Sequence, residues 1–435
     1  MVFFRMLAVA LSLLLETSPA RASDLTFQQL AKRAQCPLAS CQQPAPRLPK
    51  EDPWYTTTPK GLEQAVPGAL FRVRKAPANL PSLVANSAEA YNVLYRTTDS
   101  QYKPTYAVAT VFVPASPSTN ATLLSYQLPY DSVDLNEAPS YLMYKYQTEQ
   151  LDDIAWALGR GWHVVTGDYE GPFSSFTAGV MSGHAVLDGV RAVLSTEYSG
   201  ELKLPADTDT VRYALWGYSG GALASEWATE LQVQYAPELS FAGAALGGLT
   251  PNVTAVRDQV EGTLSAGLIP GWLIGVTSQF PDARAYLLSR LKKDGPYNAT
   301  VFMGLEQSVS NGATFAFQNI SDYLIGGFAD LKNPVIRRIT YSDGMMGYHG
   351  VPQMSVYEYK AIHDELSAGV DTDKLVERYC EAGASIFYQR DTVNDHGEEA
   401  KAGAPRARNW LVSVLEQGHT EDGCRIETIT DPWKA

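Results

Sequence analysis

Short runs of β-branched and aromatic residues alternate with longer, helix-length segments between about residues 68 and 249. Such alternation is typical of βαβ units, which place parallel strands in one sheet and helices on its faces. We therefore predict a mostly parallel central sheet flanked by helices. The strand-like runs are AYNVLYRTT (90–98), PTYAVATVFVPA (104–115), ATLLSYQL (121–128), WHVVTGDY (162–169), VRYALWGYS (211–219) and SFAGAALGG (240–248).

The alternation of strand-like and helix-like segments stops from about Thr250 to Gly350. This stretch contains frequent glycines and favours helices. About a hundred residues is too long for a connection and long enough for an inserted subdomain. We predict a catalytic core of residues 61–249 and 350–435 and a helical cap of residues 250–349. The run GLIPGWLIGV inside the insertion is predicted to pack the cap rather than to line a binding surface. After the insertion, VPQMSVYEYKAI (351–362) and ASIFYQR (384–390) resume the strands, and RARNWLVSVLEQ (406–417) predicts a closing helix.

The N-terminal stretch MVFFRMLAVALSLLLETSPARASDL has the pattern of a secretory signal peptide. A mostly apolar run extends from Met6 to Leu15, and Ala20-Arg21-Ala22 supplies the small residues that signal peptidase prefers. The run is shorter than the roughly 20 residues of a membrane-spanning helix. We predict a signal peptide of residues 1–22, a secreted protein without a transmembrane span, and an extended N-terminal arm of residues 23–60.

Cysteines and glycosylation sequons agree with a secretory route. The four cysteines lack the paired CxxC spacing of a zinc site, so an oxidising compartment favours two disulfides. Sequence order favours Cys36 with Cys41 and Cys380 with Cys424, among three possible pairings. The predicted glycosylation sites are the sequon residues Asn120, Asn252, Asn298 and Asn319.

Charge and composition narrow the possible partners. The net charge is −13 and the isoelectric point is near 5.0, which argues against nucleic acid and against attraction to anionic membranes. Hydrophobic residues make up 45% of the 435 residues, which is enough for a large core. We expect a soluble monomer.

The pentapeptide GYSGG (217–221) separates the strand-like VRYALW from the helix-like ALASEWATELQ. In an α/β-hydrolase the nucleophilic serine occupies a sharp strand-to-helix turn, where the residues two before and two after it must be small. Gly217 and Gly221 meet this demand, and the N–H of Gly220 lies at the helix N-terminus, where an oxyanion is favoured. The bare pattern arises readily by chance, so its position between strand and helix is what favours Ser219 as a nucleophile over an ordinary glycine turn.

A serine nucleophile needs a histidine base and an acid that orients it, and this fold carries them in the order Ser, Asp or Glu, His. Asp364 closely follows the strand-like VPQMSVYEYKAI, and His396 lies in a predicted loop after ASIFYQR. We therefore predict Asp364 and His396 as the partners of Ser219, with no metal and no organic cofactor. A bridge between Cys380 and Cys424 would tether the loop that carries His396. The competing acids are Asp371, Asp373 and Asp391, and the competing base is His419.

A set of longer motifs adds a family resemblance. In order from about residue 51 to 400, the chain contains EDPWYTTT, YRTT, ATVFVPA, LLSYQLPYDS, GDYEG, AGVMSGHAVLDGVRA, GYSGGALASEWA, AIHDEL and the CEAGASI segment that leads to NDHGEEA. This ordered set resembles the fungal secretory lipases typified by lipase A of Candida antarctica. The resemblance implies an α/β-hydrolase fold with a cap inserted before the acid strand, and the same triad of Ser219, Asp364 and His396. It also implies an oxyanion role for the backbone N–H of Asp131, in PYDS, together with that of Gly220.

These features predict a secreted serine carboxylic-ester hydrolase that acts through an acyl-enzyme. The main hypothesis is a triacylglycerol lipase or esterase whose acyl-ester substrate lies at a lipid–water interface. A second hypothesis keeps the chemistry and changes the substrate to an acetylated fungal secondary metabolite such as a trichothecene, because some relatives in the family resemble such deacetylases. A third is a non-enzymatic binding protein with a hydrolase fold, and the triad alone would also fit a peptidase.

Overall fold

The computed structural model describes residues 46–145, 151–195, 199–205, 207–307 and 313–434. The predicted signal peptide, most of the predicted arm, Cys36 and Cys41 lie outside these ranges. Residues 46–60 of the arm form two short helical turns, η1 (Pro49–Glu51) and α3 (Pro53–Thr56). The Asp52 side chain starts α3 by accepting a hydrogen bond from the N–H of Trp54, whose ring is buried. No helix in the described ranges combines the length and apolarity needed to cross a bilayer.

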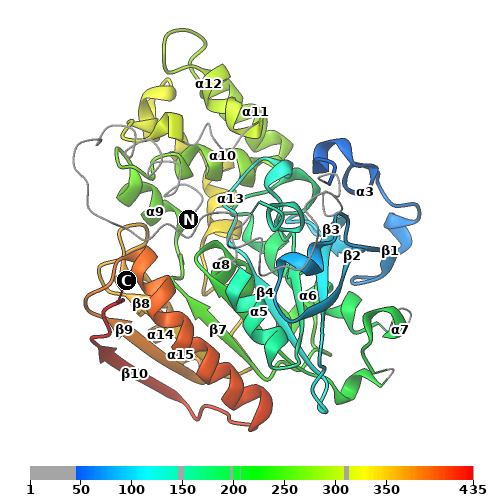
Figure 1. Cartoon of the computed structure of the whole chain (residues 1–435). Helices are drawn as coiled ribbons and strands as arrows, with labels where there is room; N and C mark the ends of the chain where they lie inside the picture. The colour runs from blue at the N-terminus through cyan, green and yellow to red at the C-terminus, as the bar shows by residue number, and fades with distance from the viewer. Residues whose placement is uncertain (1–45, 146–150, 196–198, 206, 308–312, 435) are drawn as a thin grey trace, which may run out of the picture.

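The described strands form one sheet (Figure 1). Neighbours pair antiparallel from β1 through β2 and β3 to β5, and pair in parallel from β5 to β10. The mostly parallel sheet is therefore confirmed. Its order is β1 (Leu70–Lys75), β2 (Ser87–Thr98), β3 (Pro104–Pro114), β5 (His163–Gly167), β4 (Thr122–Gln127), β6 (Arg212–Tyr218), β7 (Gly243–Gly247), β8 (Val356–Ala361), β9 (Ile386–Asp391) and β10 (Cys424–Ile429).

Helices cover both faces of this sheet, and each face has its own hydrophobic core. On one face lie α6 (Gly179–Val193), α8 (Gly220–Tyr235) and α14 (Gly369–Glu381), and on the other α5 (Asp152–Gly159) and α15 (His396–Glu416). Helix α6 is buried almost all round because it packs on the sheet at β2, β3 and β5, beside α8, and is also contacted by α13. Two short helices, α4 (Pro139–Leu142) and α7 (Ser199–Leu202), lie in connections. The other 3₁₀ turns are η2 (Leu62–Gln64), η3 (Leu80–Leu83), η4 (Leu135–Glu137), η6 (Gly171–Phe173), η8 (Thr208–Thr210), η9 (Gly304–Gln307), η11 (Ile320–Tyr323) and η12 (Gly327–Lys332).

Between β7 and β8 the chain forms a group of helices at the top of Figure 1. These helices enclose a hydrophobic cluster of their own, separate from the two clusters that face the sheet. Asn252 and Asn333 begin two of the helices by accepting hydrogen bonds from first-turn N–H groups. The helices are α9 (Val253–Val260), α10 (Leu268–Ser278), α11 (Pro281–Arg290), α12 (Ala299–Met303) and α13 (Pro334–Gly344).

Cys380 and Cys424 form a disulfide with a Cα–Cα distance of 5.8 Å. It links α14 to β10, the strand that pairs in parallel with β9. The sequence separation of 44 residues places His396 inside the closed loop. In the chain-entropy treatment, a loop of this length stabilises the fold by about 4 kcal/mol.

Candidate active site

The turn between β6 and α8 has the geometry of a nucleophile elbow, and Ser219 occupies its apex. Ser219 has φ 55° and ψ −122°, a left-handed conformation that non-glycine residues rarely adopt. A hydrogen bond of 2.8 Å from its N–H to the carbonyl of Gly247 holds the turn in place. A Cβ on Gly217 would collide with the backbone of Gly221, and one on Gly221 would collide with the carbonyl of Gln127. The glycines of GYSGG are therefore a steric requirement of the elbow.

Three predicted residues meet at this elbow. Nε2 of His396 lies 2.9 Å from Oγ of Ser219, and Nδ1 of His396 lies 2.6 Å from Oδ2 of Asp364. They come from the turn after β6, the loop after β8 and the first residue of α15. The geometry is that of a nucleophile, a base in hydrogen-bond reach of it, and an acid that orients the base.

Asp364 is held by more than the histidine. Its Oδ1 accepts the N–H groups of Leu366 at 2.8 Å and Ser367 at 2.9 Å, and its Oδ2 also accepts the ammonium of Lys360 at 2.7 Å. The side chains of Lys360 and Asp364 are fully buried. Burial alone would raise the pKa of Asp364, but the charges of His396 and Lys360 outweigh it and hold the pKa well below its usual range. Asp364 is therefore ionised at neutral pH and able to stabilise a charged imidazole.

His396 begins a helix rather than lying in a loop, so the predicted loop at this position is wrong. The sequence DHGE forms a capping box, in which the Asp395 carboxylate accepts the N–H of Glu398 at 2.7 Å and the Glu398 carboxylate accepts that of Asp395 at 3.2 Å. The D-x-x-E spacing is a helix-start signal that could have been found in the sequence.

Two further side chains fix the backbone of His396. The hydroxyl of Tyr218 donates to the carbonyl of His396 at 2.6 Å, and a carboxylate oxygen of Glu365 accepts its N–H at 2.9 Å. Tyr218 precedes Ser219 and Glu365 follows Asp364, so a chain neighbour of each of these residues also positions His396. The sequence patterns did not identify Tyr218 or Glu365, because their partner His396 lies far away along the chain. They also missed Lys360, which lies only four residues from Asp364, because its burial has no signature in the sequence.

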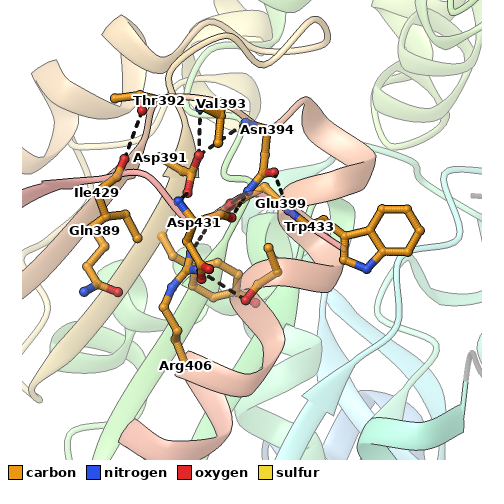
Figure 2. Close-up of polar contacts among 12 residues, drawn as sticks. Gln389, Asp391, Thr392, Val393, Asn394, Glu399, Arg406, Ile429, Asp431 and Trp433 are labelled. Atoms are coloured by element: carbon orange, nitrogen blue, oxygen red, sulfur yellow. Dashed lines mark hydrogen bonds and ion pairs between the residues drawn. The ribbon is translucent and has the colours of Figure 1, made fainter. Parts of the chain in front are cut away.

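Asp391, one of the competing acids, is buried at the end of β9 but does not bond His396. Its carboxylate instead accepts the N–H groups of Val393 at 2.8 Å, Asn394 at 3.2 Å and Asp431 at 3.0 Å. The amide of Asn394 donates to the Glu399 carboxylate at 2.8 Å and to the carbonyl of Asp431 at 2.9 Å. Figure 2 shows this cluster, which ties the segment before His396 to the segment after β10.

The other competing residues are also engaged elsewhere. Asp373 accepts a hydrogen bond of 3.0 Å from Tyr388, and Asp371 lies 3.4 Å from the ammonium of Lys374. His419 is paired with Glu421 at 3.0 Å. The only Asp side chain within hydrogen-bond distance of the His396 ring, among the described residues, is that of Asp364.

Asp131 and Gly220 adjoin the nucleophile from two sides. Asp131 follows β4 with φ 45°, and its Oδ1 fills the space where a Cβ on Gly220 would project. Burial raises the pKa of the Asp131 carboxyl above its usual range. Neither the N–H of Asp131 nor that of Gly220 donates to an acceptor in the described part of the chain, and both residues line the same cavity as Ser219. Two free donors beside a nucleophile form a suitable site for an oxyanion.

The cavity at Ser219 has a volume of about 60 Å³ and extends from the elbow between α9 and α10. Its walls are mostly apolar. The run GLIPGWLIGV lies largely in α10 and is almost entirely buried, as predicted, but three of its residues also line this cavity. The lining residues are Asp131, Phe176, Thr177, Ser219, Gly220, Leu223, Thr250, Val253, Val256, Arg257, Val260, Leu268, Ile269, Trp272 and Leu366.

The four sequon asparagines differ in their surroundings. Asn120 and Asn319 are exposed. Asn252 is half-buried and its side chain caps α9. Asn298 caps α12, and its amide also donates to the carbonyl of Gly295 at 2.6 Å. Asn120 and Asn319 are therefore the more accessible acceptors for a glycan.

A buried acid pair lies on α8, the helix that begins at the elbow. Glu226 and Glu230 are one turn apart, and the hydroxyl of Tyr379 lies within hydrogen-bond distance of a carboxyl oxygen of each. Burial, followed by the negative charge of Glu230, raises the pKa of Glu226 to about 8. A glutamate in the unfolded chain ionises near about 4.3. Between these values the folded protein binds more protons than the unfolded one, so its stability falls as the pH rises.

We therefore expect Glu226→Gln to raise the melting temperature more at pH 8 than at pH 5, because glutamine keeps the neutral shape without ionising. Differential scanning calorimetry at both pH values checks this. Glu230→Gln is the matched control: Glu230 accepts the N–H groups of His349 and Gly347, so its loss should lower the melting temperature at both pH values. An equal shift of the Glu226→Gln protein at the two pH values would contradict the assignment.

Comparison with known proteins agrees with this geometry. Residues 141–423 match the secretory lipase family. The trichothecene C-3 esterase of Fusarium sporotrichioides is 45% identical over 408 residues, which are 90% of each chain. The chain belongs to the secretory lipase family. As a member it is a carboxylic-ester hydrolase, and the family resemblance seen in the sequence is confirmed.

Other similar proteins match a comparable share of the chain at lower sequence identity. Lipase A of Arthroderma benhamiae is 36% identical over 409 residues, which cover 89% of this chain and 84% of that protein. The X-ray structure of Candida antarctica lipase A superposes with a TM-score of 0.79 at 28% identity, over 89% of this chain and 91% of the other. The α/β-hydrolase fold predicted from the sequence is thereby confirmed.

Proposed function

We propose that Ser219, His396 and Asp364 carry out ester hydrolysis through an acyl-enzyme. His396 Nε2 takes the proton of the Ser219 hydroxyl as Oγ attacks the ester carbonyl carbon. The tetrahedral intermediate then collapses, the bond to the alcohol oxygen breaks, and the alcohol leaves with the proton from His396. A water molecule, deprotonated by His396, attacks the acyl carbon. The bond between that carbon and Ser219 Oγ then breaks, His396 returns the proton to Oγ, and the acid is released.

The backbone N–H groups of Asp131 and Gly220 are proposed to hold the oxyanion in both steps. Their lack of another acceptor and their place beside Ser219 support this role. One such donor is typically worth about 10²- to 10³-fold in kcat. Asp364 keeps the imidazole in the tautomer that accepts from serine and stabilises the imidazolium that forms, while Lys360 keeps Asp364 ionised and in place.

The preferred substrate is proposed to be a short-chain acyl ester, foremost an acetate of a polycyclic alcohol such as a trichothecene. The observation that carries this proposal is the size of the cavity at Ser219, about 60 Å³. Pockets that hold drug-sized ligands measure about 300–1,000 Å³, so a space of this size favours a short acyl group. The similarity to a trichothecene C-3 esterase supports the same substrate class. Triacylglycerol at a lipid–water interface is the second candidate, supported by the lipase relatives.

Processing, secretion, glycosylation and domain organisation also belong to the proposal. We propose cleavage after Ala22, secretion of a monomer, and glycosylation foremost at Asn120 and Asn319. Residues 61–249 and 350–435 are proposed as the catalytic core and residues 250–349 as the cap. N-terminal sequencing of the secreted protein tests cleavage after Ala22, and tryptic glycopeptide mapping tests glycosylation at Asn120 and Asn319.

The substrate proposal is tested by comparing kcat/KM for a trichothecene C-3 acetate, tributyrin and triolein. We expect the acetate to be hydrolysed fastest and triolein slowest. A higher kcat/KM for triolein than for the acetate would favour the lipase hypothesis instead.

A fluorophosphonate should label Ser219 covalently, whereas a binding protein without a working triad would not react.

A further inference from the structure

A second cavity lies in the same group of helices as the cavity at Ser219. Its volume is about 350 Å³, several times that of the first. It is lined by residues of α9, α10, α13 and η12, and its walls mix aromatic, aliphatic and basic side chains. The cavity at Ser219 is called the acyl cavity below, and this one is called the outer cavity.

The two cavities share a wall. Arg257 of α9 and Trp272 of α10 line both of them. Helix α9 contributes Val253 and Val256 to the acyl cavity and Thr254 to the outer cavity, so its two sides face different spaces.

Within this wall, Arg257 is anchored away from the catalytic residues. Its Nε donates to Asp258 at 2.7 Å, and its guanidinium lies 5.1 Å from the centre of the Phe328 ring. Asp258 and Phe328 both line the outer cavity. Trp272 is 4% exposed and packs in the hydrophobic cluster of the cap. The Trp272 indole is therefore the large apolar part of the wall between the two spaces.

We propose that Trp272 sets the acyl-chain limit of this enzyme by closing the acyl cavity against the outer cavity. The proposal rests on the acyl-enzyme mechanism given above. With the indole in place, the acyl cavity ends at Trp272 and accommodates short acyl groups. Without it the two cavities join, and a medium acyl chain extends from Ser219 past Arg257 along Phe328, Leu331 and Met345.

The test is the hydrolysis of nitrophenyl acetate, butyrate, octanoate and laurate by the unmodified protein and by Trp272→Ala. We expect Trp272→Ala to raise the ratio of kcat/KM for octanoate to that for acetate by about 10- to 100-fold, since each buried methylene adds binding free energy. Trp272→Phe keeps a ring in the wall and should show only a small part of this gain. The phenylalanine loses no hydrogen bond, because the indole N–H has no acceptor in the described part of the chain.

Further variants test the role of Trp272 if the Trp272→Ala protein is unstable. Trp272→Leu should show an intermediate gain, with thermal melting used to compare folded fractions. Adding Ala329→Phe, a change on the outer cavity, to Trp272→Ala should cancel the gain on octanoate while acetate hydrolysis remains.

Two results of the ester assays would reject the role of Trp272, and a third would reject the proposed function. An unchanged chain-length profile in folded Trp272→Ala and Trp272→Leu would overturn the role of Trp272. An unmodified protein that already hydrolyses laurate as fast as acetate would overturn it too. Failure of the unmodified protein to hydrolyse any of the four esters would instead reject the proposed function itself.

Discussion

Ser219→Ala is expected to lower kcat for nitrophenyl acetate by about 10⁵-fold or more, because Ser219 carries the hydroxyl that lies within hydrogen-bond distance of His396 Nε2 in the described part of the chain. The residual rate should come from the oxyanion donors and from substrate binding alone. Stopped assays at high enzyme concentration measure the loss. The melting temperature should change little, since alanine retains the backbone of the elbow.

Ser225→Ala is the matched control on the same helix. Ser225 is fully buried, and its hydroxyl has no hydrogen-bond partner in the described ranges. Its removal should leave kcat and KM unchanged. If Ser219→Ala retained more than about one hundredth of the activity while Ser225→Ala lost it, the nucleophile would be misassigned.

Asp364→Asn is expected to lower kcat by about 10⁴-fold with a small change in KM. An amide at this position favours the wrong imidazole tautomer and leaves the imidazolium without its counter-charge. It also leaves Lys360 buried beside a neutral group. Steady-state kinetics from pH 5 to 9 measure the effect.

The same substitution should change how stability depends on pH. The pKa of Asp364 is lowered in the folded protein, so its stabilisation is fully present above the unfolded value of about 3.9 and is lost as the pH falls through the folded value. Asp364→Asn should therefore lower the melting temperature at pH 7, with a difference that narrows only under strongly acidic conditions. A melting-temperature difference that grew as the pH fell would contradict this account.

Asp391→Asn is the control for Asp364→Asn, since Asp391 is equally buried and ends the next strand. It should reduce kcat by about 10-fold, because it weakens the anchoring of the segment before His396 without removing a group that bonds the imidazole. A larger loss for Asp391→Asn than for Asp364→Asn would reassign the acid.

The sheet was largely predictable because most of its strands are buried on both faces and read as continuous apolar runs. The two strands that sequence patterns missed lie at the two edges. LFRVRK of β1 carries three basic residues, and CRIETI of β10 is mostly exposed, so neither has an apolar signature. Their pairing is decided by the neighbouring strand and, for β10, by the disulfide at Cys424.

The close approach of Ser219, His396 and Asp364 was predictable for a different reason. The chemistry demands particular residue types at the ends of particular strands, and Ser219, Asp364 and His396 meet that demand in chain order. Lys360 was not predictable, because nothing in YEYKAIHD says that a lysine will be buried. The position of Trp272 between the two cavities was also not predictable from the sequence, because it depends on how α9 and α10 pack and not on any motif.

The hydrophobic cluster enclosed by the helices between β7 and β8 has an evolutionary consequence. Substitutions at the cavity-lining positions of α9 and α10 alter the space beside Ser219 but leave the two hydrophobic clusters that face the sheet unchanged. Substrate range and catalytic competence can therefore diverge independently among descendants of one ancestor. A family that contains both lipases and trichothecene esterases is the outcome expected of such a division.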